Sequence, residues 1–565
     1  MTPVAAAEAT IAADRAHADP AIWITRVPDA ALLARANELE AEGPRGRPLW
    51  GLMVAVKDNI DVAGLPTTAA CPGYAYTPAK SAVAVQRLLD AGAIVVGKTN
   101  LDQFATGLVG VRSPYGVPRN VFDPVRVPGG SSSGSAAAVA AGIVPVALGT
   151  DTAGSGRVPA MFGNIVGLKP TIGSIPASGM VPACRSIDTI SVFARTVDEA
   201  IAVQRVIAGY DAADPYSRRA PLGYLRRSAP LAAPLLGRVD VPAALAEPYA
   251  AVAAQFPTEE VAIGTFLSVA RLLYDGPWVA ERTAALRDVV EQRADMLFPV
   301  TRNILEGGLS RLTVDAFDAF HLLAQARREA VELFERVDAL LLPTTMPCPT
   351  LAEVAADPVG VNSRLGTWTN FVNLCDLAAI AVPAGIGTDG LPFGVTVVGP
   401  AWSEGRLIAI ADAIHRASAA HVGATAAKLP PPAPEDQLGP DETALFCIGA
   451  HMSGLPLNPQ LESLGARFLH VAHTRPSYRM YALGPRPGLV REAAQGGASI
   501  EGEVWALPTA VVGALLAQVA PPLGFGTVEL EDGPCLGFVC EAAGVATAPE
   551  ITQYAGWRAW LAARR

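Results

Sequence analysis

Serines crowd one short stretch of this sequence in a pattern that could serve nucleophilic catalysis. The stretch VPGGSSSGSAAA, residues 127–138, places four serines within five positions after two glycines. Its segment 130–134 fits the G-x-S-x-G pattern of a serine held on a sharp turn between a strand and a helix. That chemistry needs a downstream histidine as the base. His321 and His415 are the first histidines downstream, and both lie in ordinary helical patterns. A different base is therefore expected.

Lys57 is the candidate for that base. It follows the apolar run GLMVAV and precedes DNID, in a chain with few lysines. An amine at the end of a buried strand loses its charge readily and can activate a serine. The structural alternative is an ion pair with Asp58 or Asp61.

A second serine lies in the block LGTDTAGSGRVPA, residues 148–160. Ser155 follows the small residues Thr152, Ala153 and Gly154, which let backbone N–H groups approach a substrate carbonyl closely. Donors placed in this way can form an oxyanion hole. A glycine-rich structural turn is the alternative for this block. A formal phosphate-loop match, GAIVVGKT at 92–99, is instead expected to be a buried strand, because β-branched residues stiffen it.

Composition excludes several classes of function. The chain has 565 residues, is 51% hydrophobic and carries a net charge of −10, which argues against a nucleic-acid partner. Its apolar runs are too short or too broken for a membrane span, and the N-terminus does not read as a signal peptide. The seven cysteines show no C-x-x-C spacing, which is typical of reduced thiols in a cytoplasmic protein. Neither a metal nor a cofactor is expected.

A Pro-rich stretch divides the chain into two predicted domains. Residues 1–425 form the large domain, 426–442 the linker and 443–565 the small domain. In the large domain, strand-like runs such as LMVAVKDNI alternate with helical patterns, which is typical of an α/β fold. Short alternating runs separated by Gly, Pro and Asp predict a mainly β (α+β) small domain.

Three blocks of the large domain closely resemble the amidase signature family. They are GLMVAVKDNIDVAG, the long block from VPGGSSSGS to VGLKPT, and VDALLLPTT with PAGIGTDGLPFGVTVVG. The resemblance covers roughly residues 25–415 and implies a mixed β-sheet core flanked by helices. It also implies a Ser–cis-Ser–Lys triad. Ser155 would be the nucleophile, Ser131 the bridging serine in a cis peptide, and Lys57 the base. The N–H groups of residues 152–155 would form the oxyanion hole.

Within that family the chain is most similar to the allophanate hydrolases. TDTAGSGRVPA, MVPACRSIDTISVFARTVDEA and the small domain carry this likeness over nearly the whole chain. It implies hydrolysis of allophanate (urea-1-carboxylate) to ammonia and N-carboxycarbamate, which then yields ammonia and CO2. It further implies a homodimer and a functional link with urea carboxylase. A broader amidase acting on biuret, aliphatic or aryl amides is the alternative. An inactive scaffold is disfavoured by the complete triad.

A carboxylated substrate needs a cation, and arginine offers a planar fork for it. Tyr274 and Arg282 stand eight positions apart, as do the Tyr and Arg that hold the carboxylate in allophanate hydrolases. A surface helix with Arg282 paired to Glu281 or Asp288 is the alternative. Other cations near the nucleophile block are Arg157 and Arg185. The loop of residues 103–116 should line the pocket, with Thr106 and Gly107 as the contacts.

The small domain resembles the C-terminal domain of allophanate hydrolases, with a γ-glutamylcyclotransferase-like fold. The implied task is decarboxylation of N-carboxycarbamate. His451, after an apolar strand, is the candidate residue for that task, with His473 as second choice and Glu503 as a candidate partner. A structural histidine is the alternative.

Overall fold

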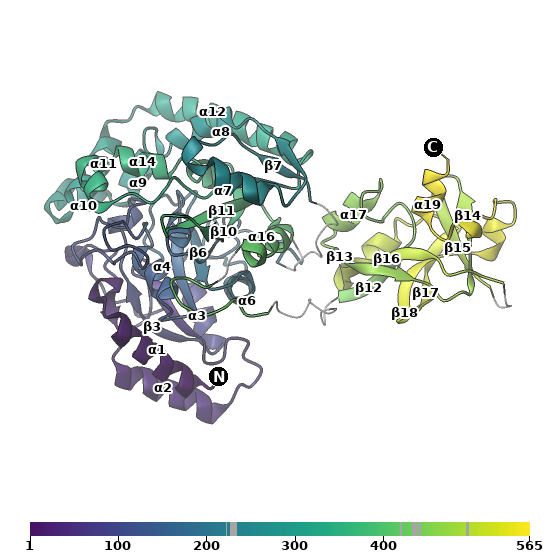
Figure 1. The fold of residues 1–565 in the computed structure, drawn as a ribbon, viewed down its shortest axis with the longest axis horizontal. Coiled ribbons are helices and arrows are strands. Elements are labelled where there is room, and N and C mark those ends of the chain that lie inside the picture. The colour runs from purple at the N-terminus through teal and green to yellow at the C-terminus, as the bar shows by residue number, and fades with distance from the viewer. Residues whose placement is uncertain are drawn as a thin grey trace. The chain divides into compact units, whose positions relative to one another are not determined.

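The computed structural model describes residues 1–221, 223–225, 234–418, 421–431, 438, 442–492 and 496–564. The chain divides into two compact units (Figure 1). One comprises Met1–Ala220 and Ala232–Pro432. The other comprises Ala433–Arg565 with the short segment Pro221–Leu231. Each unit has its own hydrophobic core.

A mixed sheet forms the centre of the large unit. In the described residues it has eleven strands in the order β1-β3-β2-β4-β6-β5-β10-β11-β9-β7-β8. Strand β2 pairs in parallel with both β3 and β4, whereas β4 and β6 are antiparallel. The strands are β1 (Trp23–Arg26), β2 (Met53–Lys57), β3 (Ile94–Thr99), β4 (Val146–Asp151), β5 (Val166–Lys169), β6 (Thr189–Ala194), β7 (Leu236–Arg238), β8 (Thr258–Glu260), β9 (Ala339–Pro343), β10 (Leu377–Ile386) and β11 (Pro392–Pro400).

Helices surround this sheet (Figure 1). They are α1 (Pro3–His17), α2 (Asp29–Glu42), α3 (Val83–Asp90), α4 (Ser133–Ala140), α5 (Val158–Phe162), α6 (Val197–Ile207), α7 (Ala243–Ala253), α8 (Gly264–Arg271), α9 (Trp278–Ala285), α10 (Arg287–Gln292), α11 (Pro299–Gly307), α12 (Thr313–Phe334), α13 (Leu351–Ala356), α14 (Gly360–Leu365), α15 (Asn370–Leu374) and α16 (Glu404–Ser418). The predicted α/β class, with a mixed sheet flanked by helices, is confirmed.

Every residue of strand β2 is buried, because both faces of the strand are covered. Val54 and Val56 belong to one core cluster, while Met53 and Ala55 belong to a second cluster that contains the alanines of α4. Side chains alternate between the faces of a strand, so Lys57 continues the face of Met53 and Ala55. The fold therefore directs Lys57 toward α4 and the serines that precede it.

The segment that matches a phosphate loop is a strand, as predicted. Residues 94–99 form β3 and every one of them is buried. The alanine-rich N-terminal segment forms α1, and α3 directly precedes β3.

The small unit is mainly β. Its five-stranded sheet has the order β13-β16-β12-β18-β17, and β14 pairs with β15 in a separate hairpin. The mainly β small domain that the sequence predicts is confirmed. The elements are β12 (Glu442–Cys447), α17 (Asn458–Ser463), β13 (Arg467–His473), β14 (Tyr478–Leu483), β15 (Arg486–Arg491), β16 (Glu501–Pro508), α18 (Val512–Leu516), β17 (Leu523–Leu530), β18 (Gly533–Cys540) and α19 (Trp557–Ala562).

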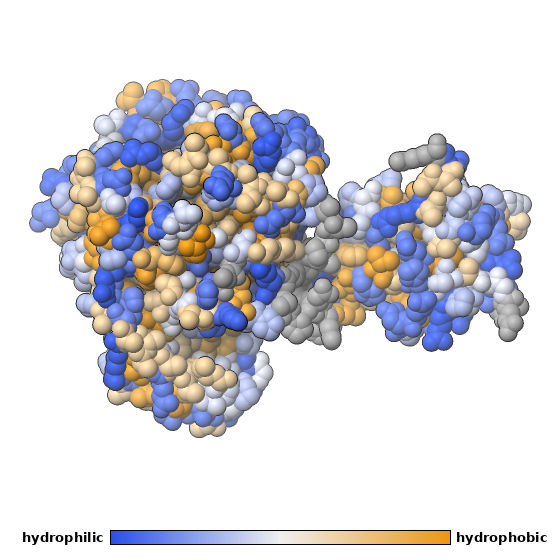
Figure 2. All heavy atoms as spheres, in the orientation of Figure 1, coloured by the Kyte–Doolittle hydropathy of each residue, from blue (hydrophilic) through white to orange (hydrophobic). Residues whose placement is uncertain are grey.

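All seven cysteines are buried free thiols. Among the described residues, no cluster of His, Cys, Asp and Glu could hold a metal ion, and no helix has the length and hydropathy needed to cross a membrane. On the face drawn in Figure 2, hydrophilic and hydrophobic residues are interspersed over the large unit.

Candidate active site

Lys57 lies at the end of β2 and is completely buried. Its Nζ donates to Ser131 Oγ and to Thr150 Oγ1, both at 2.7 Å. Burial disfavours the charged amine and lowers the pKa of Lys57 from 10.5 to about 7, although Asp102 and Asp151 act in the opposite direction. An amine with this pKa can accept a proton near neutral pH.

The predicted alternative for Lys57, an ion pair with Asp58 or Asp61, is not formed. Asp58 Oδ1 lies 3.1 Å from Nζ of the neighbouring lysine, Lys98, and both side chains are fully buried. Asp61 accepts hydrogen bonds from Thr67 and Tyr76. In the described part of the chain, no carboxylate lies within ion-pair distance of Lys57.

Ser131 follows a cis peptide bond from Gly130. Its carbonyl accepts a hydrogen bond from the Asp102 backbone N–H at 3.0 Å. A Cβ at position 130 would lie 2.2 Å from Asp102 Oδ2, so glycine is required there. The next serine, Ser132, donates to the Thr150 carbonyl at 3.2 Å. The serine stretch therefore lies against the end of β4, just before the turn that carries Ser155.

Asp151 organises that turn. Its carboxylate accepts the N–H groups of Gly154 and Gly156 at 2.9 and 3.0 Å. It also accepts hydrogen bonds from Nε and Nη2 of Arg157, both at 2.9 Å. This ion pair is fully buried. Arg157, one of the cations considered for the substrate, is therefore engaged in holding the turn.

Gly154 has a φ of +122°, and a Cβ there would lie 2.4 Å from Thr369 Oγ1. Only glycine suits both constraints. The Gly154 N–H is bonded to Asp151 in the free protein, and its role as an oxyanion donor stays a prediction. The N–H groups of Thr152, Ala153 and Ser155 have no hydrogen-bond acceptor among the described residues, so three of the four predicted donors are available.

Arg282 lies on α9 and is fully buried, so the surface-helix alternative is wrong. Its Nη1 donates to the Ala105 carbonyl and to Thr106 Oγ1, at 3.1 and 3.0 Å. Among the residues that the structure describes, neither its Nε nor its Nη2 has a hydrogen-bond partner, and the buried Tyr274 hydroxyl has none either. The guanidinium carbon lies 5.5 Å from the Tyr274 ring centroid.

Unpaired donors of this kind are rare in protein interiors, and a guanidinium fork suits a carboxylate. Glu281, which the alternative interpretation paired with Arg282, accepts hydrogen bonds from Ser186 instead. Arg185 is exposed.

Of the two predicted contacts in the 103–116 loop, Thr106 is bonded to Arg282, whereas Gly107 lies against Asp102 and Arg112. Thr106 accepts from Arg282 through its hydroxyl and from Arg112 Nη1 through its carbonyl, at 3.0 and 2.8 Å. Gly107 packs on Asp102, where a Cβ would lie 2.6 Å from Oδ2. Tyr274 and Arg112 also line a cavity of about 180 Å³.

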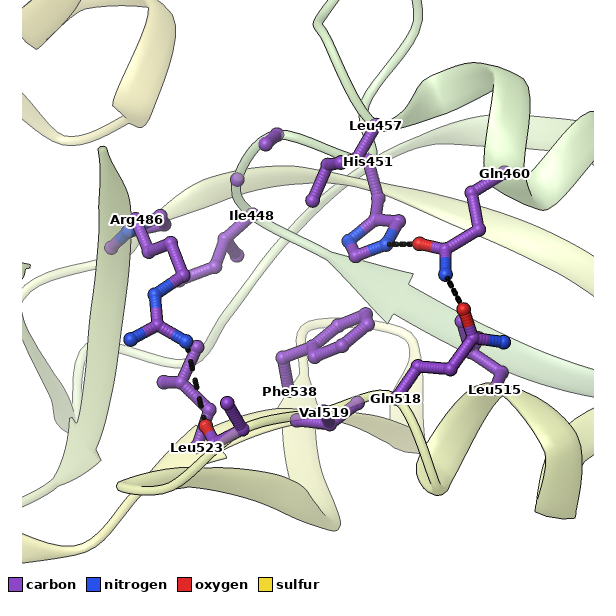
Figure 3. Close-up of a pocket in the computed structure, with 14 residues that line it drawn as sticks. Ile448, His451, Leu457, Gln460, Arg486, Leu515, Gln518, Val519, Leu523 and Phe538 are labelled. Atoms are coloured by element: carbon purple, nitrogen blue, oxygen red, sulfur yellow. Dashed lines mark hydrogen bonds between the residues drawn. The ribbon is translucent and has the colours of Figure 1, made fainter.

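In the small unit, His451 lines a cavity of about 140 Å³ (Figure 3). Its ring stacks on Phe538 with centroids 4.9 Å apart, and its Nε2 lies 2.8 Å from Gln460 Oε1. Burial lowers the pKa of His451 below its ordinary value, which favours the neutral ring at neutral pH.

The other two polar candidates of the small unit are placed differently. His473 Nε2 lies 4.0 Å from Glu501 in an ion pair whose side chains are nearly half exposed. Glu503 is buried and accepts from Ser453, Trp505 and Arg558. Its expected pairing with His451 is not formed, because these three donors engage the carboxylate.

The family models match almost the whole of both units. The model described as Amidase matches residues 8–241 and 245–408, and the allophanate hydrolase C-terminal domain matches residues 443–562. The chain belongs to the amidase family. Its membership of this family is as predicted.

Relatives narrow this assignment. Urea amidolyase of Saccharomyces cerevisiae is 42% identical over 568 residues, covering 95% of this chain and 31% of its own length. The structure of Kluyveromyces lactis allophanate hydrolase is 39% identical with a TM-score of 0.81, covering all of this chain and 97% of that one. A glutamyl-tRNA(Gln) amidotransferase subunit from Geobacillus stearothermophilus is 35% identical over 69% of this chain and 88% of its own. The chain thus spans about a third of the length of the first curated relative.

The sequence interpretation missed three residues that support the site. Thr150 is the second acceptor for Lys57, while Asp151 and Asp102 shape the turn and the serine stretch. The sequence shows that these polar residues lie next to apolar runs. The residues around them do not indicate which distant groups they bind.

Proposed function

We propose that this chain hydrolyses allophanate to ammonia and N-carboxycarbamate, with Ser155 as nucleophile. The observation that carries the proposal is the buried Arg282 fork, two of whose nitrogens, like the nearby Tyr274 hydroxyl, have no hydrogen-bond partner in the described part of the chain. A small substrate with a carboxylate next to its amide would supply the missing acceptors. The full-length likeness to an allophanate hydrolase supports the same substrate.

Proton transfer would start from neutral Lys57. Lys57 Nζ takes the Ser131 proton, Ser131 takes the Ser155 proton, and Ser155 Oγ attacks the amide carbonyl. The 2.7 Å contact between Lys57 and Ser131 supports the first of these transfers. The protons return to the leaving nitrogen, which departs as ammonia. Water then hydrolyses the acyl-enzyme by the same relay.

Negative charge on the attacked carbonyl oxygen would be stabilised by the backbone. The free N–H groups of Thr152, Ala153 and Ser155 are the donors of this oxyanion hole. Each such donor contributes a few kcal/mol to transition-state stabilisation. Asp151 fixes the turn that carries these donors, because its carboxylate accepts hydrogen bonds from the N–H groups of Gly154 and Gly156.

The small unit would act on the product. We infer that N-carboxycarbamate decarboxylates in the cavity at His451, giving CO2 and a carbamate that releases ammonia. Arg486 is the charged residue among the described residues that line this cavity, and it suits an anionic ligand.

Broader amidase activity on biuret or on aliphatic and aryl amides is the competing function. A neutral amide substrate would offer no carboxylate to the guanidinium group of Arg282. Ammonia release from allophanate, malonamate, biuret and benzamide separates the two. We expect the carboxylated amides, allophanate and malonamate, to be hydrolysed with far higher kcat/KM than the neutral ones. Equal values for all four would contradict the proposal.

We also propose a homodimer working in the cytoplasm next to urea carboxylase. Relatives named urea amidolyase are about three times as long as this chain, which leaves room for a partner activity on the same polypeptide. Exposed apolar side chains on and just before α12, Leu312, Val314, Phe317 and Phe320, support a protein interface there. Light scattering of the parent chain and of Phe317→Asp tests the dimer, which we expect the substitution to dissociate.

A further inference from the structure

A line of side-chain hydrogen bonds leads from a backbone carbonyl to the His451 ring (Figure 3 shows its last two links). Gln518 Nε2 donates to the Ala514 carbonyl at 3.1 Å. Gln460 Nε2 donates to Gln518 Oε1 at 2.6 Å. Gln460 Oε1 in turn lies 2.8 Å from His451 Nε2.

The first acceptor determines the direction of the whole line. A backbone carbonyl can only accept, so the Gln518 amide must turn its NH2 group toward Ala514. Its Oε1 then faces Gln460 and requires a donor there. Gln460 therefore presents its own Oε1 to His451, and the ring nitrogen next to it must carry the hydrogen.

We propose that Gln518 and Gln460 hold neutral His451 in the Nε2–H tautomer, so that Nδ1 presents its lone pair to the cavity. Figure 3 shows the two ring nitrogens on opposite sides, with Nε2 toward Gln460 and the other toward the space shared with Arg486. Both glutamines are positioning residues, because they act through His451 and not on the ligand.

Packing also restricts the plane of the His451 ring. The imidazole lies nearly parallel to Phe538, with an interplanar angle of 13°. Phe538 is held in turn by the edge of Phe525, with centroids 4.9 Å apart. A flip of the ring by half a turn would keep this stacking but would place Cε1 where Nε2 now meets Gln460, so the hydrogen bond selects the present ring orientation.

This tautomer suits the decarboxylation, a consequence that rests on the proposed function. In N-carboxycarbamate with one carboxyl group protonated, Nδ1 accepts the carboxyl proton and returns it to the substrate nitrogen. The bond between that nitrogen and the departing carboxyl carbon breaks, and its electron pair stays on the nitrogen. The products are CO2 and the carbamate anion, and the imidazole ends as it began.

Substitution of the exposed Gln518, which does not touch His451, tests the relay in the full chain. Gln518→Glu can only accept, so Gln460 keeps its orientation and Nε2 keeps its hydrogen. Gln518→Lys can only donate, so the Gln460 amide turns over and the hydrogen moves to Nδ1. Gln553→Lys, at an exposed position in the same unit, is the matched control.

The readout is ¹⁵N NMR of histidine-labelled protein without substrate, with the His451 signals assigned from His451→Gln. We expect protonated Nε2 in the parent, in Gln518→Glu and in Gln553→Lys, and protonated Nδ1 in Gln518→Lys. Protonated Nδ1 in the parent, or unchanged spectra in Gln518→Lys, would overturn the proposal.

Enzyme-catalysed release of ¹³CO2 from labelled allophanate is the second readout. It should fall about a hundredfold in Gln518→Lys, while the first release of ammonia stays unchanged. A switched tautomer with unchanged ¹³CO2 release would support the positioning role and contradict the function proposed for the small unit.

Discussion

Lys57 Nζ and Ser131 Oγ lie 2.7 Å apart in a fully buried setting, although 74 positions separate them in the chain. Lys57 ends β2, and Ser131 lies two residues before α4, which packs on the same face of the sheet. Their contact follows from the way the two elements pack. It joins a base with a pKa near neutrality to the serine that can deliver a proton to it.

Removal of the amine tests this relay. Lys57→Met keeps the length of the buried side chain and removes the proton acceptor, so we expect kcat for ammonia release to fall at least about a thousandfold. Lys80→Met, at an exposed position, is the matched control and should retain parental activity. A Lys57→Met protein that folds and keeps more than a tenth of the parental kcat would exclude Lys57 as the base.

The pH dependence should report the same group. Because burial lowers the pKa of Lys57 to about 7, kcat/KM should rise with pH through about 7 and then level off. The loss on acidification should be reversible, with unchanged near-UV circular dichroism. A profile that is flat between about pH 6 and pH 8 would contradict a neutral lysine base.

The free energy of unfolding should depend on pH in a direction that follows from the lowered pKa of Lys57. Between pH 7 and 10.5 the unfolded chain keeps the Lys57 proton while the folded protein has lost it. The contribution of Lys57 to the free energy of unfolding therefore rises with pH over that window and is lowest, and constant, below it. Comparing urea unfolding of the parent and of Lys57→Met at several pH values should show a steeper rise in the parent, because Lys169, whose pKa is lowered to about 8, contributes a rise to both proteins.

Tyr274→Phe removes a hydroxyl that has no partner in the free protein, so folding should be unaffected. The substrate carboxylate would lose one donor, and we expect KM for allophanate to rise about tenfold with little change for benzamide. Tyr216→Phe, at an exposed tyrosine, serves as control. Equal effects on the charged and the neutral amide would show that Tyr274 does not bind the carboxylate.

Asp151→Asn should be costly for stability, because it leaves the buried Arg157 guanidinium without its charge partner. We expect the free energy of unfolding to drop by about 3–5 kcal/mol, measured by urea denaturation. Glu332→Gln breaks the exposed pair with Arg328 and should change it by less than about 1 kcal/mol. Similar effects for both would argue against the role of Asp151 in holding the turn.

The sequence was most informative where function restricts residue type locally. Apolar runs identified β2 and β3, and the family resemblance pointed to Lys57, Ser131 and Ser155. Pairings between distant segments were not predictable, because they depend on strand register and helix packing. Lys57 therefore looked able to pair with its neighbour Asp58, whereas that aspartate reaches Lys98 on the adjacent strand.

The sequence also did not show which backbone N–H groups are already engaged in hydrogen bonds within the protein. The small-residue turn predicts that Gly154 donates to the oxyanion, but an aspartate three positions earlier takes its N–H. Glu503 was expected as a partner of His451, but the fold brings Arg558 and Ser453 to its carboxylate instead. Such assignments depend on loop geometry that composition and periodicity do not encode.

The most direct test is to trap the acyl-enzyme. Labelled allophanate is mixed with the full chain, quenched in acid within milliseconds, and digested for mass spectrometry. A label on the peptide that carries Ser155, absent from Ser155→Ala, which should also release no ammonia, is the predicted result. A label on another residue, or full ammonia release by Ser155→Ala, would contradict the account.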